Sequence, residues 1–124
     1  MKVLKWKKTD VPNFDNVPVK PGIYIISTAQ EDNNEYVVKY VGQADDLRSR
    51  VQEHFSKFEQ NAELRAHIEE KYIMKFNYSE VEEKEDRDGM VLYLRSIFNP
   101  PYNSGPLPDI TPLKCTVPGV RKRL

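Results

Sequence analysis

The chain has 124 residues, enough for one domain with a single core and flanking tails. Its composition is 39% hydrophobic and 31% charged, which excludes a disordered chain, and no apolar run approaches the roughly 20 residues of a membrane span. Nineteen basic and nineteen acidic side chains give a formal net charge of zero, which argues against a domain that grips nucleic acid by charge alone.

The charge is unevenly distributed, and the cysteine content is low. Basic residues gather near both ends of the chain: Lys2, Lys5, Lys7, Lys8, Lys114, Arg121, Lys122 and Arg123. These ends either lie together as one basic face or remain two solvated tails. Cys115 is the only cysteine, so an internal disulfide and a cysteine-based zinc site are excluded. With no signal-peptide pattern, we expect a cytoplasmic protein.

The first third of the chain is predicted to contain an irregular lead-in followed by a hairpin. Residues 1–21 carry three prolines and are expected to be irregular. Residues 22–27 and 35–42 are rich in β-branched and aromatic side chains, and the polar stretch 30–34 between them suits a hairpin loop. Two antiparallel strands are therefore predicted.

Helical periodicity dominates the middle of the chain. Asp45 is predicted to cap a helix in which apolar residues and His54 recur at helical spacing. A short second helix over 62–71, a strand over 72–78 and a third helix over 87–98 follow. The third helix is expected to end at Asn99, because proline disfavours helical geometry at the residue before it.

These elements predict an α+β domain. A small three-stranded antiparallel sheet flanked by helices, in the order ββααβα, is expected over residues 22–103. Residues 104–124 form a proline-rich, basic C-terminal extension that we expect to run extended over the body.

Four short motifs follow one another along the predicted domain. Gly22-Ile23-Tyr24 opens the first strand, Tyr40-Val41-Gly42 closes the second, Arg50 and His54 share a helical face, and Pro101-Tyr102-Asn103 follows the last helix. This set, in this order, resembles the GIY-YIG nuclease family over roughly two-thirds of the chain. Either triplet alone is a weak signal.

The resemblance implies a divalent-metal-dependent endonuclease that hydrolyses DNA. Tyr24 or Tyr40 would act as general base, and Arg50 would stabilise transition-state charge. His54 would relay a proton or serve as a core histidine. Asn103 would hold a phosphate oxygen or anchor the pocket wall, while Gly22 and Gly42 belong to the structural motifs.

The metal ligand departs from the family pattern. Members of the family use a glutamate on the third helix, and this chain has none between Asp86 and Asn103. Counting back from Asn103 lands on Val91 in one register and on Asp88 in a longer one. We expect Asp88 to hold the cation, Mg²⁺ or Mn²⁺, because a hard cation can bind through one carboxylate and several waters.

An alternative function remains open. Without the glutamate, the chain could be a nucleic-acid-binding or partner-binding module on the same fold, with catalysis weakened or lost. DNA is the expected substrate, although RNA stays open and no membrane partner is expected. A homodimer or a partner protein would have to supply specificity, because no attached DNA-binding domain is visible.

Overall fold

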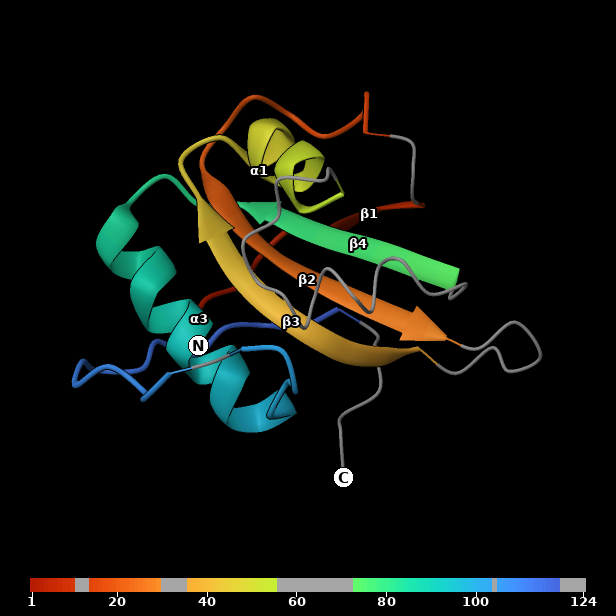
Figure 1. Ribbon diagram of the computed structural model, residues 1–124. Coiled ribbons are helices and arrows are strands. Elements are labelled where there is room, and N and C mark those ends of the chain that lie inside the picture. Colours follow the sequence, from red (N-terminus) through yellow and green to blue (C-terminus); the bar gives the residue numbers. More distant parts are fainter. Residues whose placement is uncertain (11–13, 30–35, 56–72, 104, 119–124) are drawn as a thin grey trace.

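The computed structural model describes residues 1–10, 14–29, 36–55, 73–103 and 105–118. In chain order it contains β1 (Lys7–Asp10), β2 (Gly22–Ala29), β3 (Val37–Ala44), α1 (Leu47–His54), β4 (Ile73–Glu80) and α3 (Lys84–Phe98) (Figure 1). The α+β class is confirmed. The predicted hairpin loop over 30–34 and the predicted second helix over 62–71 lie outside the described residues.

The sheet has four strands rather than the predicted three. All neighbours are antiparallel, and the strand order is β1-β4-β2-β3. The additional strand, β1, lies in the stretch predicted to be irregular. Its Lys7 and Lys8 are exposed whereas Thr9 is buried, which suits an edge strand, where charged side chains also discourage pairing with other chains. The element order in the described part is therefore βββαβα.

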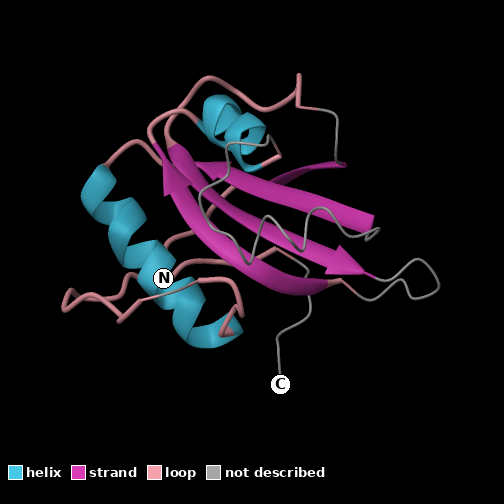
Figure 2. Ribbon diagram, viewed as in Figure 1, coloured by secondary structure: helices cyan, strands magenta, loops and turns pink. Residues whose placement is uncertain are grey.

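The two helices cover opposite faces of this sheet (Figures 1 and 2). Successive residues of a strand point to opposite faces. On β2, Tyr24 and Ile26 pack in one apolar cluster with Leu47 and Val51 of α1. Their neighbours Ile23 and Ile25 pack in a second cluster with residues of α3. We refer to these as the α1 face and the α3 face.

Both helix starts differ from the prediction. Asp46, not Asp45, caps α1: its backbone is extended, and its carboxylate accepts hydrogen bonds from the Ser49 backbone and hydroxyl. Helix α3 begins at Lys84, three residues earlier than predicted, because β4 ends at Glu80 and only residues 81–83 connect the two elements. It ends as predicted, with Asn99 in the left-handed conformation and Pro100 next.

Residues 2–6 lie beside residues 114–116, while Arg121, Lys122 and Arg123 of the predicted basic face lie outside the described residues. Lys2 forms a parallel bridge with Cys115, in which its backbone N–H donates to Lys114 and its carbonyl accepts from Thr116. Thr116 also accepts hydrogen bonds from the Leu4 backbone and the Trp6 indole. In the described part of the chain, no helix has the length and apolar character needed to cross a bilayer.

Candidate active site

Tyr24 and Tyr40 lie on the α1 face of neighbouring strands. Tyr24 pairs with Gly42, and Tyr40 pairs with Ile26, so both tyrosines point to one side of the sheet. Their rings stack with centroids 6.2 Å apart. One pair further along, the register shifts and leaves Lys39 as an extra residue on β3. Such bulges bend an edge strand and redirect its side chains.

A buried hydrogen bond joins Tyr24 to helix α1. Its hydroxyl oxygen lies 2.5 Å from Nε2 of His54, and each of the two side chains is only 1% exposed. The ring of Tyr40 is also packed edge-on against the imidazole, with centroids 5.1 Å apart. Tyr40 itself is half-buried. The structure therefore brings the two tyrosines and His54 into one cluster.

The protonation state of His54 follows from its surroundings. Burial lowers its pKa from 6.5 to about 3, and the charge of Arg50 adds to this effect, against a smaller opposing effect of Glu53. The imidazole is therefore neutral near pH 7, with one nitrogen able to accept a hydrogen bond and one able to donate. A neutral imidazole next to a phenol can accept a hydrogen bond from it.

The motif glycines leave room for this arrangement. A Cβ built on Gly42 would lie 2.4 Å from the Tyr24 hydroxyl oxygen. One on Gly22 would lie 2.3 Å from the Ser79 carbonyl oxygen and 2.6 Å from a methyl carbon of Leu47. Any side chain at Gly42 would displace the phenol from His54, and any at Gly22 would push α1 away from the sheet.

Arg50 lies on α1, one turn before His54. Its Nη1 donates to Oε1 of Glu53 at 2.7 Å, and its side chain is 27% exposed. Exposed ion pairs of this kind contribute only about 0–1 kcal/mol. An incoming phosphate can therefore compete for the guanidinium at little cost.

Asn103 is bound to the edge strand. Its Oδ1 accepts from the Val41 backbone N–H at 2.8 Å, and its Nδ2 donates to the Val41 carbonyl at 2.7 Å. The Tyr102 backbone N–H donates to the carbonyl of the bulged Lys39 at 3.1 Å. The closing motif is thus joined to β3 at Lys39 and Val41, on either side of Tyr40.

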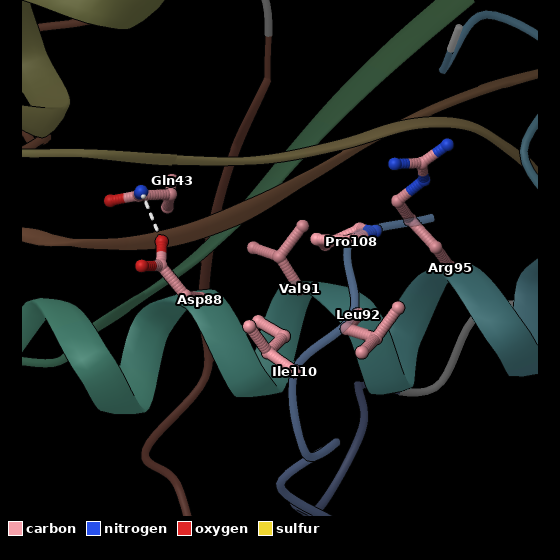
Figure 3. A pocket seen from close by; sticks show the side chains of 7 residues that line it. All are labelled: Gln43, Asp88, Val91, Leu92, Arg95, Pro108 and Ile110. Atoms are coloured by element: carbon pink, nitrogen blue, oxygen red, sulfur yellow. Dashed lines mark hydrogen bonds between the residues drawn. The ribbon is translucent and has the colours of Figure 1, made fainter. Parts of the chain in front are cut away.

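Asp88 lies on the α3 face, away from the tyrosine cluster. Its carboxylate accepts from Nε2 of Gln43 on β3 at 2.8 Å (Figure 3). It also accepts from Nζ of Lys84 at 3.0 Å. Val91 lies one turn further along the same side of α3, and both residues line one hollow. The two positions that the sequence left as alternative metal ligands thus line the same hollow.

Sequence reasoning missed two residues beside Asp88. Arg87 is 2% exposed; it donates to Oε1 of Gln43 at 2.9 Å, to Asp45 at 2.7 Å and to the backbone carbonyls of residues 81 and 82. Its spacing from Met90 and Leu94 puts it on the apolar stripe of α3, which was the available signal. Gln43 therefore links Arg87 to Asp88 and fixes the direction of that carboxylate.

The sequence model of the GIY-YIG catalytic domain matches residues 20–88, more than half of the chain. The chain therefore belongs to the GIY-YIG family. No curated protein matches the chain. The match confirms the family predicted from the motifs, and with it a nuclease-type fold in a family whose members are generally endonucleases. It spans both triplets, Arg50 and His54 and ends at Asp88, so Asn103 lies beyond it.

The metal that GIY-YIG nucleases typically use has a sparse donor set here. Across the ranges that the structure describes, no three His, Cys, Asp or Glu side chains come together. Asp88 offers one carboxylate, whose side chain is 36% exposed. A single carboxylate fits a hard cation that keeps most of its waters or takes phosphate oxygens. Binding would require Lys84 to leave the carboxylate, a small loss for an exposed pair.

Proposed function

We propose that this GIY-YIG protein is a divalent-metal-dependent endonuclease that hydrolyses phosphodiester bonds of DNA. The observation that carries the proposal is the buried hydrogen bond between Tyr24 and His54, with Tyr40 packed on both rings and Arg50 one turn away. A phenol, an imidazole and a guanidinium at one strand edge supply a proton acceptor and a phosphate clamp. Ordinary packing of a core does not need that combination.

The tyrosines divide the work in this proposal. Tyr40 is partly exposed and can touch a water or a phosphate, whereas Tyr24 is 1% exposed and cannot. Tyr40 is therefore the general base, and the buried Tyr24–His54 pair holds its ring in place.

Arg50 binds the scissile phosphate. Its planar guanidinium can donate two parallel hydrogen bonds to phosphate oxygens, and these strengthen as negative charge develops in the transition state. Asn103 acts through β3: its two bonds to Val41 hold the strand that carries Tyr40. It is a positioning residue, since its amide oxygen and its amide nitrogen are both hydrogen-bonded to the backbone of Val41.

Asp88 would hold the cation, Mg²⁺ or Mn²⁺. When bound, such a cation supplies charge neutralisation at a phosphate oxygen and helps the leaving oxygen depart. Gln43 donates to one carboxylate oxygen of Asp88 and thereby orients it toward β3. Outer hydrogen bonds of this kind fix a ligand's orientation.

Plasmid cleavage tests the proposal. Supercoiled plasmid and branched or flapped DNA are incubated with the full chain and Mg²⁺, Mn²⁺ or EDTA, beside a Tyr40→Phe variant that lacks only the hydroxyl. We expect cleavage with a metal ion, none in EDTA, and a rate about a hundredfold lower for Tyr40→Phe. Cleavage that is undiminished in Tyr40→Phe would remove the assigned base. Nicked circles as first product indicate one cut per binding event, whereas direct linearisation indicates a dimer.

A second function has one observation in its favour. Asp88 already pairs with Lys84 and Gln43, and the neighbouring position is Val91 rather than an acid. A binding module on the GIY-YIG fold, without hydrolysis, would have these features. It predicts DNA binding without cleavage in Mg²⁺ and in Mn²⁺, on the same substrates.

A further inference from the structure

A hollow of about 320 Å³ lies beside the Asp88 carboxylate. Its walls come from the end of β3, the side of α3 and the C-terminal segment (Figure 3). The lining residues are Gln43, Asp88, Val91, Leu92, Arg95, Pro108 and Ile110. Ligand sites commonly enclose roughly 300–1,000 Å³, so this space suits one small group rather than a long one.

The outer wall is held close to the helix. The backbone N–H of Leu113 donates to the carbonyl of Gly89 at 2.9 Å, and Arg95 donates to the carbonyl of Gly105 at 3.3 Å. A Cβ on Gly89 would lie 3.0 Å from Cβ of Leu113 and 3.1 Å from the carbonyl oxygen of Thr111. The glycine thus lets the segment dock against α3, so the hollow is formed before any ligand arrives.

The hollow has opposite charges at its ends. Val91, Leu92, Pro108 and Ile110 make an apolar floor, with Asp88 and Gln43 at one end and Arg95 at the other (Figure 3). Seven residues, or two helical turns, separate Asp88 from Arg95, about 10.5 Å along the axis. Among the described residues no carboxylate pairs with Arg95, whose guanidinium therefore remains available for an anion.

We infer that this hollow binds the deoxynucleotide beside the cut phosphate of DNA. Its sugar lies on the apolar floor, and a flanking phosphate binds Arg95. The inference rests on the proposed function, in which a cation held by Asp88 would neutralise an oxygen of the scissile phosphate. The arginine fork matches phosphate oxygens.

The hollow gives this chain a means of substrate selection of its own. Five of its lining residues lie outside the range matched by the family model: Val91, Leu92, Arg95, Pro108 and Ile110. Contacts made there bear on which DNA is held, because none of these five residues has a role in the proposed chemistry.

Binding at varied salt tests the inference. The intact chain is titrated against a fluorescein-labelled DNA duplex in EDTA, where no cleavage is expected, and anisotropy is followed from 50 to 300 mM NaCl. Arg95→Gln should weaken binding about tenfold at low salt and flatten the slope of log affinity against log salt by about 0.9, one phosphate contact. Ile110→Ser should weaken binding about fivefold and leave that slope unchanged, because it removes only apolar contact.

Two variants on the same segment serve as controls. Leu107→Ser removes an exposed apolar side chain that does not line the hollow, and Lys114→Gln removes an exposed cation outside it. Both should bind like the unsubstituted chain. The inference is overturned if Arg95→Gln keeps the full salt slope, or if Ile110→Ser binds no more weakly than Leu107→Ser. Thermal unfolding of each variant confirms that the fold is retained.

The plasmid assay separates this inference from the proposed function. If the chain cleaves DNA while Arg95→Gln and Ile110→Ser bind normally, the hollow is not a nucleotide site and the nuclease proposal stands. If both variants lose binding and the chain never cleaves with Mg²⁺ or Mn²⁺, hydrolysis fails and the nucleotide site stands.

Discussion

The two faces of the sheet beside β3 are built in different ways. On the α1 face, Tyr24 and His54 are each 1% exposed and bonded to each other, so they belong to the core as well as to the candidate site. On the α3 face, Asp88 is half-exposed and its partners are a glutamine and a lysine. Substitutions of the site residues on the α1 face should therefore lower the stability of the fold, whereas those on the α3 face should alter it little.

Arg50 tests the α1 half most severely. Arg50→Ala should lower the DNA cleavage rate by about 10²–10³, the loss seen when a donor to a developing oxyanion is removed. Arg48→Ala is the matched control, since Arg48 lies on the same helix but donates to the carbonyls of Val17 and Asp15. It should lower the melting temperature and leave the rate of the folded protein nearly unchanged. Equal cleavage losses in both variants would contradict the role given to Arg50.

Asp88 is the corresponding test of the α3 half. Asp88→Asn should weaken Mn²⁺ binding, measured by isothermal titration calorimetry, and lower the cleavage rate by about a hundredfold. Asp45→Asn removes an acid whose side chain is 90% exposed and which pairs with Arg87. That control should bind Mn²⁺ normally. If the two variants bind Mn²⁺ alike, the α3 face holds no cation at Asp88.

The burial of His54 predicts a dependence of stability on pH. Its pKa is lowered to about 3 in the folded chain, so the unfolded chain, with a pKa near 6.5, binds the proton first. Stability therefore falls as the pH drops below 6.5 and continues to fall toward pH 3. Between pH 6.5 and 5 the loss should be about 2 kcal/mol, at about 1.36 kcal/mol for each pH unit.

Urea unfolding at these pH values measures the effect. His54→Gln should be less stable at pH 7 but should lose this part of the pH dependence, while His67→Gln, which replaces the only other histidine, should keep it. A pH dependence that survives in His54→Gln would mean that another group causes it.

The smallest expected effect is a gain in Mn²⁺ affinity on substitution of Val91. Val91→Glu places a second carboxylate one turn from Asp88 in the same hollow, and added ligand charge tightens a cation site. We expect Mn²⁺ affinity to rise about tenfold. Val91→Gln has nearly the same size without the charge and should leave the affinity unchanged. An equal effect of both substitutions would show that the carboxylate is not a ligand.

Local chemistry predicted the elements that carry the motifs. The β-branched runs gave β2, β3 and β4 to within two residues at each end, and Pro100 marked the end of α3. The edge strand β1 escaped because its four residues are mostly charged and pair only with β4. The cap was predicted one residue early, at Asp45, because the local sequence does not reveal that this carboxylate pairs with Arg87, 42 positions away.

The contacts that build the candidate site depend on packing. Tyr24 and His54 are 30 residues apart, and whether they meet is decided by how α1 lies on the sheet. The bulge at Lys39 and the clamp of Asn103 on Val41 are likewise invisible in composition or spacing. The sequence therefore predicted the identity of the candidate site residues better than their contacts.

The bridge between Lys2 and Cys115 bears on how the chain folds. The bond from the Leu4 backbone to the Thr116 hydroxyl joins positions 112 residues apart, and closing so long a loop carries a large entropic cost. We expect this seam to close after the sheet and α3 have formed, and to open first on heating. The C-terminal segment that reaches this bridge also forms the outer wall of the hollow beside α3. A tag fused to either end of the chain would therefore disturb the hollow.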